Sequence, residues 1–399
     1  MPELAQRLGR MAESGTAAVF SRVAELRRQG VDLISLSVGE LDFATPAHII
    51  EATADAMRRG ETRYTETSGV LALRQAICAD SVRRRAVAHD SHEVVVCGGA
   101  KHALFQLAQA LYNPGDRVII PTPCWGSYVE QAKLFGADPV LLPCAAENGF
   151  VPDLSDLERE LAGGAKALIL CSPNNPTGAV LSTAFMQSLA ELLRAHDCFV
   201  IVDEIYAQLT YGGEPAPSLL TVAPDLRDRT VIVDGVSKAY AMTGFRIGWA
   251  LAPAPVAAAI TRLQSQATSN VSTVSQAAAL AALCGDQSSI AAMRTALIQR
   301  RDRLYAGLAS IQGFDPGPLA AGAFYVLADV RGLYGRVAAG RALQSDHDVA
   351  AFLLEQAKVA TVPGSAFFAP GTLRFSYAES LERIERALEH IRSALREIA

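Results

Sequence analysis

A lysine and an arginine eight residues apart form the densest group of reactive side chains in the sequence. They are Lys238 and Arg246, in the segment SKAYAMTGFRIGW, which follows a largely apolar run at 230–236. A lysine that leaves the carboxyl end of a strand in an α/β sheet reaches the edge where ligands bind. Burial favours its neutral amine, which forms a Schiff base with an aldehyde, and an arginine suits a phosphate. The alternative is a solvated surface pair.

An aspartate and a tyrosine follow a second apolar run. Asp203 comes directly after FVIV at 199–202, and Tyr206 comes three residues later. A carboxylate in this place can keep a pyridine nitrogen protonated, which makes the ring an electron sink for a carbanion. The tyrosine hydroxyl can donate to a phenolate oxygen. For Asp203 alone, the competing interpretation is a helix cap.

Two segments rich in turn-forming residues also follow apolar runs. In SPNNPTG at 172–178, Asn175 precedes a proline and is biased toward an extended backbone, so its amide can meet a ring oxygen or a substrate. In GGAKHALF, the residues Gly99, Ala100 and Lys101 open a helix whose exposed N–H groups can hold an anion. An ordinary turn and close helix–strand packing are the alternatives.

Three single residues complete the candidate site. Trp125, in PTPCWGSY, can stack on a planar ring or can simply belong to the core. Arg374, in TLRFSYA, can hold a carboxylate with its bidentate fork or can form a surface ion pair. Gly39, in SLSVGELDF, can let the backbone approach a ligand or can serve only a turn.

The elements that must position these residues are short strands alternating with amphipathic helices. Between about residues 94 and 250, β-branched runs alternate with stretches such as 101–112, where apolar residues share one helical face. This alternation is typical of a mainly parallel sheet covered by helices, so we predict an α/β core. The predicted strands are Val94–Cys97, Arg117–Ile120, Ala167–Cys171, Phe199–Val202, Thr230–Val233 and Ile247–Leu251.

The two flanks of the chain predict a second, smaller domain. Ala17–Gln29 has the pattern of an amphipathic helix, and the closing stretch 381–398 repeats apolar residues at spacings of three and four. We therefore expect residues 1–45, with an N-terminal arm, and 285–399 to form the small domain. Residues 46–284 then form the large, ligand-binding domain.

The composition favours small-molecule chemistry. The 399 residues are 50% hydrophobic and 19% charged, which is enough for a sizeable core, and a net charge of -5 gives no basic surface for nucleic acid. The N-terminal stretch lacks a secretory pattern, no run is apolar enough to span a membrane, and the seven cysteines form no CxxC pair. We expect no nucleic-acid, membrane or metal partner and a cytoplasmic location with reduced thiols.

Taken together, the motifs resemble those of fold-type I enzymes that use pyridoxal 5′-phosphate (PLP), specifically the class I aminotransferases around bacterial aspartate and aspartate/prephenate aminotransferase. The similarity covers nearly the whole chain, in family order and at family spacing. It rests on SLSVGELDFATP, TRYTETSGV, GGAKHALF, SPNNPTGAV, VDEIY, GVSKAYAMTGFRIGW, GAFYVL and LRFSYA. The resemblance implies a large domain with a mainly parallel seven-stranded sheet, a smaller α/β domain from both termini, and a homodimer with shared active sites.

The resemblance also implies roles around the cofactor ring. Lys238 matches the lysine that carries PLP and moves a proton, and Asp203 matches the partner of the pyridine nitrogen. Tyr206 and Asn175 match the ligands of the ring hydroxyl, and Trp125 matches the ring stacked on the cofactor.

Further matches concern the phosphate and the substrate. Tyr64 matches a tyrosine that reaches the phosphate from the neighbouring subunit. The other matches to phosphate contacts are Gly99, Ala100, Lys101, Ser237 and Arg246. The matches to the substrate site are Gly39, Trp125, Asn175 and Arg374. Among them, Arg374 matches the main residue that binds the substrate's α-carboxylate.

The implied activity is that of a PLP-dependent aminotransferase. It exchanges an amino group between an L-amino acid, aspartate or another acidic substrate, and a 2-oxo acid such as 2-oxoglutarate, by a ping-pong cycle. The alternatives are aromatic, neutral or specialised substrates, a C–S β-lyase, and a PLP-sensing regulator, which would need an added DNA-binding domain. The departures from the family pattern are Leu41, Cys124, Gly126, Asp234 and Phe245, in place of a proline, a tyrosine, a bulkier residue, an asparagine and a tryptophan. Two of them flank Trp125, which favours a wider or differently polar pocket.

Overall fold

A seven-stranded sheet forms the core of the larger part of the molecule. The computed structural model describes residues 3–213, 215–338 and 341–396. The strand order is β2-β8-β7-β6-β5-β3-β4, and every neighbouring pair is parallel except the two that involve β8. The predicted mainly parallel sheet is therefore confirmed. The strands are β2 (Val94–Cys97), β3 (Arg117–Thr122), β4 (Asp138–Pro143), β5 (Ala165–Cys171), β6 (Phe199–Asp203), β7 (Thr230–Gly235) and β8 (Gly248–Leu251).

Most of these strands are apolar throughout because elements cover both faces of the sheet. Every residue of β2, β7 and β8 is buried, for example. The six predicted strands agree with the observed ones to within two residues at each end. The edge strand β4 has no counterpart among them. Three of its six residues are exposed, and Pro139 and Pro143 confine the apolar run of its sequence DPVLLP to Val140–Leu142, which is shorter than the runs of the other strands.

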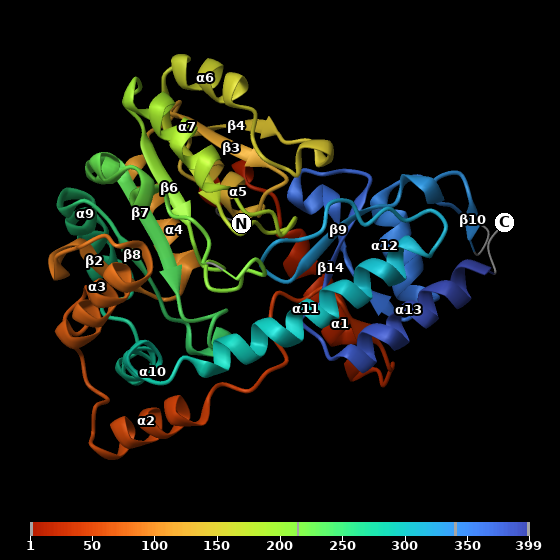
Figure 1. Cartoon of the computed structure of the whole chain (residues 1–399), viewed down its shortest axis with the longest axis horizontal. Coiled ribbons are helices and arrows are strands. Elements are labelled where there is room, and N and C mark those ends of the chain that lie inside the picture. The colour runs from red at the N-terminus through yellow and green to blue at the C-terminus, as the bar shows by residue number, and fades with distance from the viewer. Residues whose placement is uncertain (1–2, 214, 339–340, 397–399) are drawn as a thin grey trace.

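Helices pack around this sheet (Figure 1). In α4, Leu104, Leu107, Ala108 and Leu111 share the buried face, as their spacing predicts. The helices of this part are α2 (Ala47–Arg58), α3 (Leu71–Arg85), α4 (Ala100–Leu111), α5 (Ser127–Leu134), α6 (Leu154–Ala162), α7 (Thr183–Arg194), α8 (Leu219–Val222), α9 (Ala254–Ala267) and α10 (Thr273–Cys284).

The smaller part of the molecule combines segments from both ends of the described chain. Ile34 in β1 lies opposite Val359 in β12, in a parallel pair, and β9, β14 and β13 form an antiparallel sheet. The long helix α11 extends from the larger part toward α13 (Figure 1). The elements are α1 (Gly15–Arg28), β1 (Ile34–Ser35), α11 (Ser288–Ala309), β9 (Tyr325–Asp329), β10 (Val337–Ala338), β11 (Arg341–Ala342), α12 (Asp346–Glu355), β12 (Val359–Ala360), β13 (Val362–Pro363), β14 (Thr372–Ser376) and α13 (Leu381–Arg396). The domain boundaries after residues 45 and 284 stay a prediction.

The two outer helices lie close to their expected positions. α1 begins two residues before the predicted start at Ala17, where the Ser14 side chain accepts a hydrogen bond from the Ala17 backbone. α13 follows the predicted apolar spacing, and residues 397–399 of that prediction lie outside the described residues. The short helices are η1 (Gln6–Arg10), η2 (Ser91–Glu93), η3 (Ala146–Asn148), η4 (Pro224–Arg229), η5 (Thr243–Phe245), η6 (Arg331–Leu333) and η7 (Gly364–Phe367).

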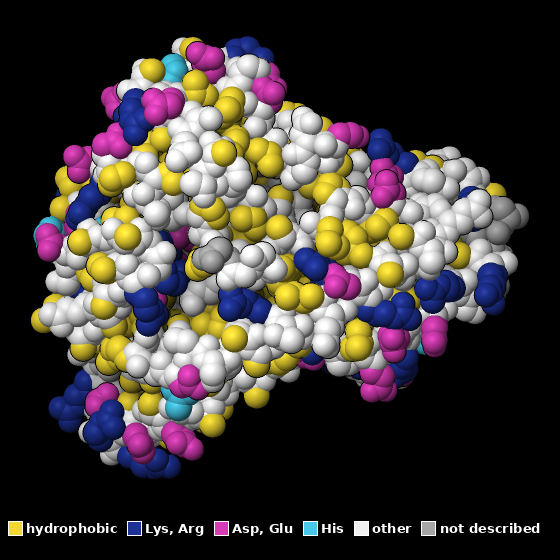
Figure 2. Space-filling view, in the orientation of Figure 1, with side chains coloured by type: hydrophobic (Ala, Val, Ile, Leu, Met, Phe, Trp, Pro, Cys, Tyr) yellow, Lys and Arg dark blue, Asp and Glu magenta, His cyan; other side chains and the backbone are white. Residues whose placement is uncertain are grey.

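The surface carries charges of both signs. On the face shown in Figure 2, Lys and Arg side chains lie among Asp and Glu side chains, with hydrophobic ones between them. No helix in the described part of the chain combines the length and the apolar character that a membrane span requires. All seven cysteines are free thiols.

Candidate active site

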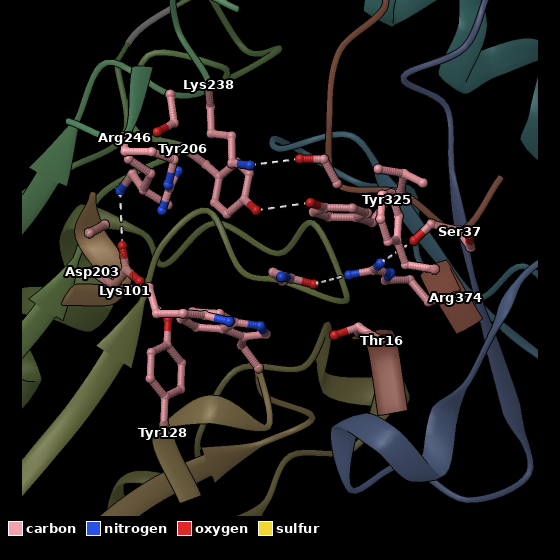
Figure 3. Close-up of a pocket in the computed structure, with 18 residues that line it drawn as sticks. Thr16, Ser37, Lys101, Tyr128, Asp203, Tyr206, Lys238, Arg246, Tyr325 and Arg374 are labelled. Carbon is pink, nitrogen blue, oxygen red and sulfur yellow. Dashed lines mark hydrogen bonds between the residues drawn. The ribbon is translucent and has the colours of Figure 1, made fainter. Parts of the chain in front are cut away.

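The carboxyl ends of the central strands meet the smaller part of the molecule at a cavity of about 260 Å³. Asp203 is the last residue of β6, and Lys238 comes three residues after the end of β7. Arg374 enters the same cavity from β14 of the smaller part. Of the residues predicted from the sequence, all but Gly99 and Tyr64 line this cavity, and Figure 3 shows many of them converging on it.

The amine of Lys238 points across the cavity toward the smaller part. Its Nζ donates a hydrogen bond to the carbonyl oxygen of Gly39 at 2.6 Å and lies 6.0 Å from the centre of the Tyr206 ring. Burial disfavours the ammonium and lowers the pKa of Lys238 to about 8, although the nearby Glu40 opposes this shift. A substantial fraction of the amine is therefore neutral and nucleophilic near pH 8.

A buried carboxylate faces the same space. Asp203 is 2% exposed, and it accepts hydrogen bonds from Tyr128 Oη at 2.7 Å and from the backbone N of Ile205 at 3.1 Å. Burial raises the pKa of Asp203 to about 6, even though both hydrogen bonds favour the charged form. The carboxylate is thus fixed in orientation where its charge would stabilise a cationic group in the cavity.

Arg374 brings a buried positive charge to the opposite wall. Nη1 donates to Asn175 Oδ1 at 2.8 Å, and Nη2 donates to the Ser37 carbonyl oxygen at 2.7 Å. Among the described residues Arg374 forms no ion pair, and its Nε has no hydrogen-bond partner. The guanidinium lies 4.4 Å from the centre of the Tyr325 ring. A carboxylate ligand would supply the counterion that this site lacks.

Two tyrosines join these walls. The hydroxyls of Tyr206 and Tyr325 lie 2.9 Å apart, and their rings meet edge to face. Burial raises the pKa of both phenols, so each hydroxyl keeps its proton at neutral pH. Either hydroxyl can be the donor in this pair, and when Tyr325 donates, the Tyr206 hydroxyl is free to donate into the cavity.

The start of α4 forms an anion-binding surface. Gly99 precedes the helix with a φ of +93°, a conformation that favours glycine, and Ala100 is the first helical residue. A Cβ at Gly99 would lie 2.6 Å from Nη2 of Arg246, so the guanidinium lies directly against this loop. A Cβ at Gly248 on β8 would lie 2.7 Å from the carbonyl carbon of Gly99. The N–H groups of Ala100 and Lys101, at the positive end of the helix dipole, and the guanidinium together suit a phosphate.

Lys101 and Trp125 form the outer wall. The Nζ of Lys101 lies 4.6 Å from the centre of the indole ring, and burial together with Arg246 lowers the pKa of this lysine. Both residues also line a neighbouring hollow of about 450 Å³, to which Gly126 contributes. Cys124 lies elsewhere, in a small cavity behind Tyr128. A wider pocket beside Trp125 stays a prediction.

Two predicted residues stand apart from the cavity within this chain. Gly99 lies directly behind Arg246. Tyr64 is 91% exposed between α2 and α3, where it lines a separate hollow with Thr273 and Cys284. Its assignment to a neighbouring subunit's site stays a prediction. Within the described residues, no group of three or more His, Cys, Asp or Glu side chains could hold a metal ion.

The structure also reveals lining residues that the sequence argument missed. Tyr128 lies in α5, three residues after Trp125, and the two rings meet edge to face with their centres 5.5 Å apart. Because Trp125 precedes the helix, helical spacing gave no signal for Tyr128. Tyr325 lies in the motif GAFYVL, which contributed to the resemblance without a role. Thr16, Phe20 and Ser37 line the cavity too, but their local sequence carries no chemical signal.

Comparisons with known proteins agree with this geometry. The profile of the family "Aminotransferase class I and II" matches residues 31–391. The chain is 42% identical to aspartate aminotransferase of Geobacillus stearothermophilus, over 98% of each chain. It is 38% identical to aspartate/prephenate aminotransferase of Nitrosomonas europaea, over 98% of this chain and 100% of that one. The crystal structure of aspartate aminotransferase from Rhizobium meliloti superposes with a TM-score of 0.94 at 38% identity, covering 100% of both chains.

Proposed function

Because this chain belongs to the aminotransferase class I and II family, we propose that it moves an amino group between an L-amino acid and a 2-oxo acid with PLP as cofactor. The proposed amino donor is aspartate, the substrate in the names of its full-length relatives, and 2-oxoglutarate is the proposed acceptor. One observation carries the proposal. The Lys238 amine, the Asp203 carboxylate and the unpaired Arg374 guanidinium face a single cavity.

The residues around the cavity fit PLP at each of its functional groups. The α4 start and Arg246 suit the phosphate, and Asp203 suits a protonated pyridine nitrogen. Tyr206 and Asn175 offer a hydroxyl and an amide to the ring oxygen, while the Lys238 amine suits the aldehyde. When bound, PLP withdraws electrons from the substrate Cα and so weakens its C–H bond.

The chain's own groups then control proton movement. Lys238 Nζ, with a pKa lowered to about 8, would take a proton from the substrate Cα. It would then deliver a proton to the cofactor carbon that carried the aldehyde. Asp203 keeps the ring nitrogen protonated through its charge, and Tyr128 holds that carboxylate in place. The Tyr325 hydroxyl fixes the orientation of Tyr206.

Substrate recognition is proposed to rest on two cations. Arg374 binds the α-carboxylate, because its Nε lacks a partner and its other contacts are neutral oxygens. Lys101, which forms no ion pair within the described part of the chain, is the candidate for the distal carboxylate of aspartate. The neighbouring hollow beyond it leaves room for longer side chains.

A homodimer with shared active sites is part of the proposal. Tyr64 is a large side chain that is 91% exposed, and within this chain it does not line the cavity that it is expected to serve. In a second copy it would offer a hydroxyl to the phosphate group. Tyr64→Phe is expected to weaken PLP binding without changing the oligomeric state.

The decisive experiment is a panel of amino donors tested on the purified protein with PLP. Aspartate, glutamate, phenylalanine and alanine are paired with 2-oxoglutarate, oxaloacetate and pyruvate, and the loss of the bound-cofactor absorbance is followed. Lys238→Ala should lose at least four orders of magnitude in turnover. Lys166→Ala, at the amino end of β5, is the matched control and should remain active. Full turnover by Lys238→Ala, or pyruvate release from cystathionine without an acceptor, would refute the proposal.

A further inference from the structure

The segment that carries Tyr64 has no regular secondary structure, yet its backbone is firmly held. Residues 63–70, which we call the Tyr64 loop, lie between α2 and α3 and belong to no helix or strand. The carbonyl oxygen of Ser68 accepts a hydrogen bond at 2.9 Å from the backbone N of Val96, on the edge strand β2. The Tyr64 side chain is nevertheless 91% exposed. A fixed loop thus presents an uncovered aromatic side chain.

A buried glutamine joins this loop to β2. The side chain of Gln264, on α9, is fully buried, and its Nε2 donates to the carbonyl oxygen of Thr67 at 2.7 Å and to that of Val96 at 3.0 Å. Gly69 packs so closely on the same strand that a Cβ there would lie 2.5 Å from Cγ2 of Val96. β2 leads to Gly99, just before the start of α4. The Tyr64 loop is therefore mounted on the strand that also positions the anion-binding surface of its own chain.

A second buried glutamine holds the loop from α10. Gln276 is also fully buried. Its Oε1 accepts a hydrogen bond from the backbone N of Val70 at 2.8 Å, and its Nε2 donates to Oγ1 of Thr65 at 3.2 Å. On the same helix, Oγ1 of Thr273 donates to the carbonyl oxygen of Arg63 at 2.6 Å. The exposed tyrosine lies directly between two of the residues held in this way, so α10 restrains the backbone on both sides of it.

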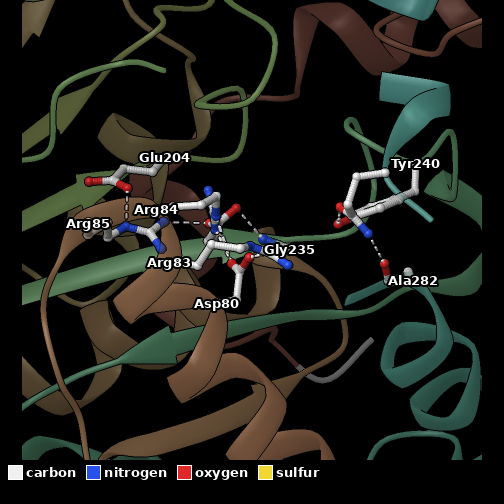
Figure 4. Close-up of polar contacts among 10 residues, drawn as sticks. Asp80, Arg83, Arg84, Arg85, Glu204, Gly235, Tyr240 and Ala282 are labelled. Atoms are coloured by element: carbon white, nitrogen blue, oxygen red, sulfur yellow. Dashed lines mark hydrogen bonds and ion pairs between the residues drawn. The ribbon is translucent and has the colours of Figure 1, made fainter. Parts of the chain in front are cut away.

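The helices that hold the loop are themselves tied to the larger part of the molecule. α3 begins directly after the loop, and near its end Nε of Arg85 donates to Glu204 at 2.6 Å. At the end of α10, Nε2 of Gln287 donates to the Ala282 carbonyl oxygen at 2.8 Å, and Oη of Tyr240 donates to Oε1 of Gln287 at 2.7 Å. Figure 4 shows Arg85 directed at Glu204 and, separately, Tyr240 beside Ala282. The supports of the Tyr64 loop are therefore part of the packed core.

The two glutamine amides need a physical reason to be buried. Removing an amide from water costs free energy unless its hydrogen bonds are replaced, and an apolar side chain of similar size would fill the same space without that cost. Here the replacing hydrogen bonds go largely to one irregular segment. A segment that is already ordered loses little conformational entropy when its exposed side chain meets a ligand or a second protein. The glutamines thus make the Tyr64 loop a rigid support.

We propose that Gln264 and Gln276 are positioning residues for the active site of a second copy of this chain, because they fix the loop from which Tyr64 offers its hydroxyl to the phosphate bound there. This inference rests on the proposed function, which supplies the dimer with shared sites. Neither glutamine lines the cavity of its own chain. Both therefore act through the tyrosine, and their effect belongs to the partner's site.

The first test measures PLP binding. Gln276→Leu removes two contacts to the loop, so it should raise the dissociation constant of PLP roughly tenfold, as Tyr64→Phe should. In a Tyr64→Phe background the same change should have an effect of less than about twofold, because its route of action is already lost. Gln106→Leu is the matched control, since Gln106 is buried on α4 and contacts Cys97 instead of the loop. Independent, additive effects of the two changes would overturn the proposal.

Mixed dimers separate an effect on the partner from an effect within one chain. When one subunit carries Lys238→Ala and the other carries Gln276→Leu, the remaining Lys238 amine is served by the intact loop of the first subunit. The affinity for PLP at that amine, followed by the bound-cofactor absorbance, should equal that of the wild type. When both changes are in the same subunit, the amine faces the loosened loop, and the affinity should fall roughly tenfold. Equal affinities in the two arrangements would contradict the assignment.

Hydrogen exchange in the PLP-free protein tests the loop without the cofactor. Gln276→Leu removes the acceptor of the Val70 N–H, so exchange of that amide should become at least about tenfold faster, and unchanged exchange would refute the anchoring. If Gln276→Leu does not fold, Gln264→Leu, which removes the contact to Thr67, gives the same comparisons. A wild-type protein that binds no PLP would refute the proposed function. Normal PLP binding that neither change affects would refute the positioning role alone.

Discussion

Two equally buried arginines have different partners, one in the proposed substrate cavity and one among buried carboxylates. Arg374 and Arg85 are 3% exposed each. Arg85 lies between the carboxylates of Glu204 and Asp234, at 2.6 Å from each. Arg374 contacts an amide oxygen and a backbone carbonyl oxygen, and it forms no ion pair in the part of the chain that the structure describes.

The difference teaches where this fold tolerates an uncompensated charge. A buried charge without a counterion is destabilising, so an unpaired arginine persists only where a ligand can provide the counterion. The same reasoning applies to Asp203, whose hydrogen-bond donors are a tyrosine and a backbone amide. Each of the following changes tests one side of this comparison.

The largest effect is expected at Arg374. Arg374→Gln removes the charge that meets the substrate carboxylate, so kcat/KM for amino donors should fall by roughly 10³ to 10⁴, or about 4–5.5 kcal/mol. Steady-state kinetics measure this loss. Arg374→Lys keeps the charge without the bidentate geometry, so its kcat/KM should lie between those of the wild type and Arg374→Gln. A value of kcat/KM within tenfold of the wild type would place the carboxylate elsewhere.

Arg85 should show the opposite profile. Arg85→Gln leaves Glu204 and Asp234 with less positive charge in a buried space, so the free energy of unfolding should drop by about 3–5 kcal/mol. Denaturant unfolding gives this number, and kcat/KM at the optimal pH should stay within a few fold. Arg58→Gln, in an exposed ion pair, is the control and should change little. A stable Arg85→Gln protein with poor activity would contradict the comparison.

Asp203 should destabilise the cofactor-free protein at neutral pH. Its pKa is raised from 3.8 to about 6, so its favourable contribution is complete below pH 3.8 and is lost as the pH rises through about 6. Asp203→Asn should therefore raise the free energy of unfolding at pH 7 by about 2–3 kcal/mol relative to the wild type, and the difference should shrink toward pH 4. With PLP bound, the wild type should instead be more stable than Asp203→Asn. Thermal unfolding across this pH range measures both effects.

Tyr128 should give the smallest change. Tyr128→Phe removes one hydrogen bond to the charged form of Asp203, so kcat/KM should fall about tenfold, or about 1.4 kcal/mol. Loss of this donor also raises the pKa of Asp203, and the acid limb of the pH–rate profile should move to higher pH. An unchanged profile would mean that Tyr128 serves only packing.

The sequence predicted the elements that carry local signals. Lys238, Asp203 and Asn175 each follow a largely apolar run, and such runs form the central strands of a covered sheet, so the sheet edge and its residues could be placed. The edge strand β4 could not, because two prolines bound its short apolar run and half of its residues are exposed. Likewise Tyr325 carries no signal of its own, since its role depends on the long-range contact with Tyr206.

The sequence also did not predict which buried arginines form ion pairs. Arg84 and Arg85 lie in the run RRR near the end of α3, a pattern that usually indicates a solvated helix face. Arg85 is instead buried because β6 and β7 bring Glu204 and Asp234 to it across more than a hundred residues. Conversely, nothing in the motif LRFSYA distinguishes a paired from an unpaired arginine at position 374.

The close approach of Gly248 to Gly99 limits how this enzyme can be altered. Any side chain at position 248 would meet the backbone of the loop that begins α4, and neither strand nor loop can yield without displacing the other. A saturation library at that codon should return glycine almost alone. At Gly126, beside the roomy hollow, a Cβ would lie 3.0 Å from the backbone oxygen of Ala366, so a library there should return mainly small residues. Efforts to change what this catalyst accepts should therefore begin around Trp125 and leave Gly99 and Gly248 unchanged.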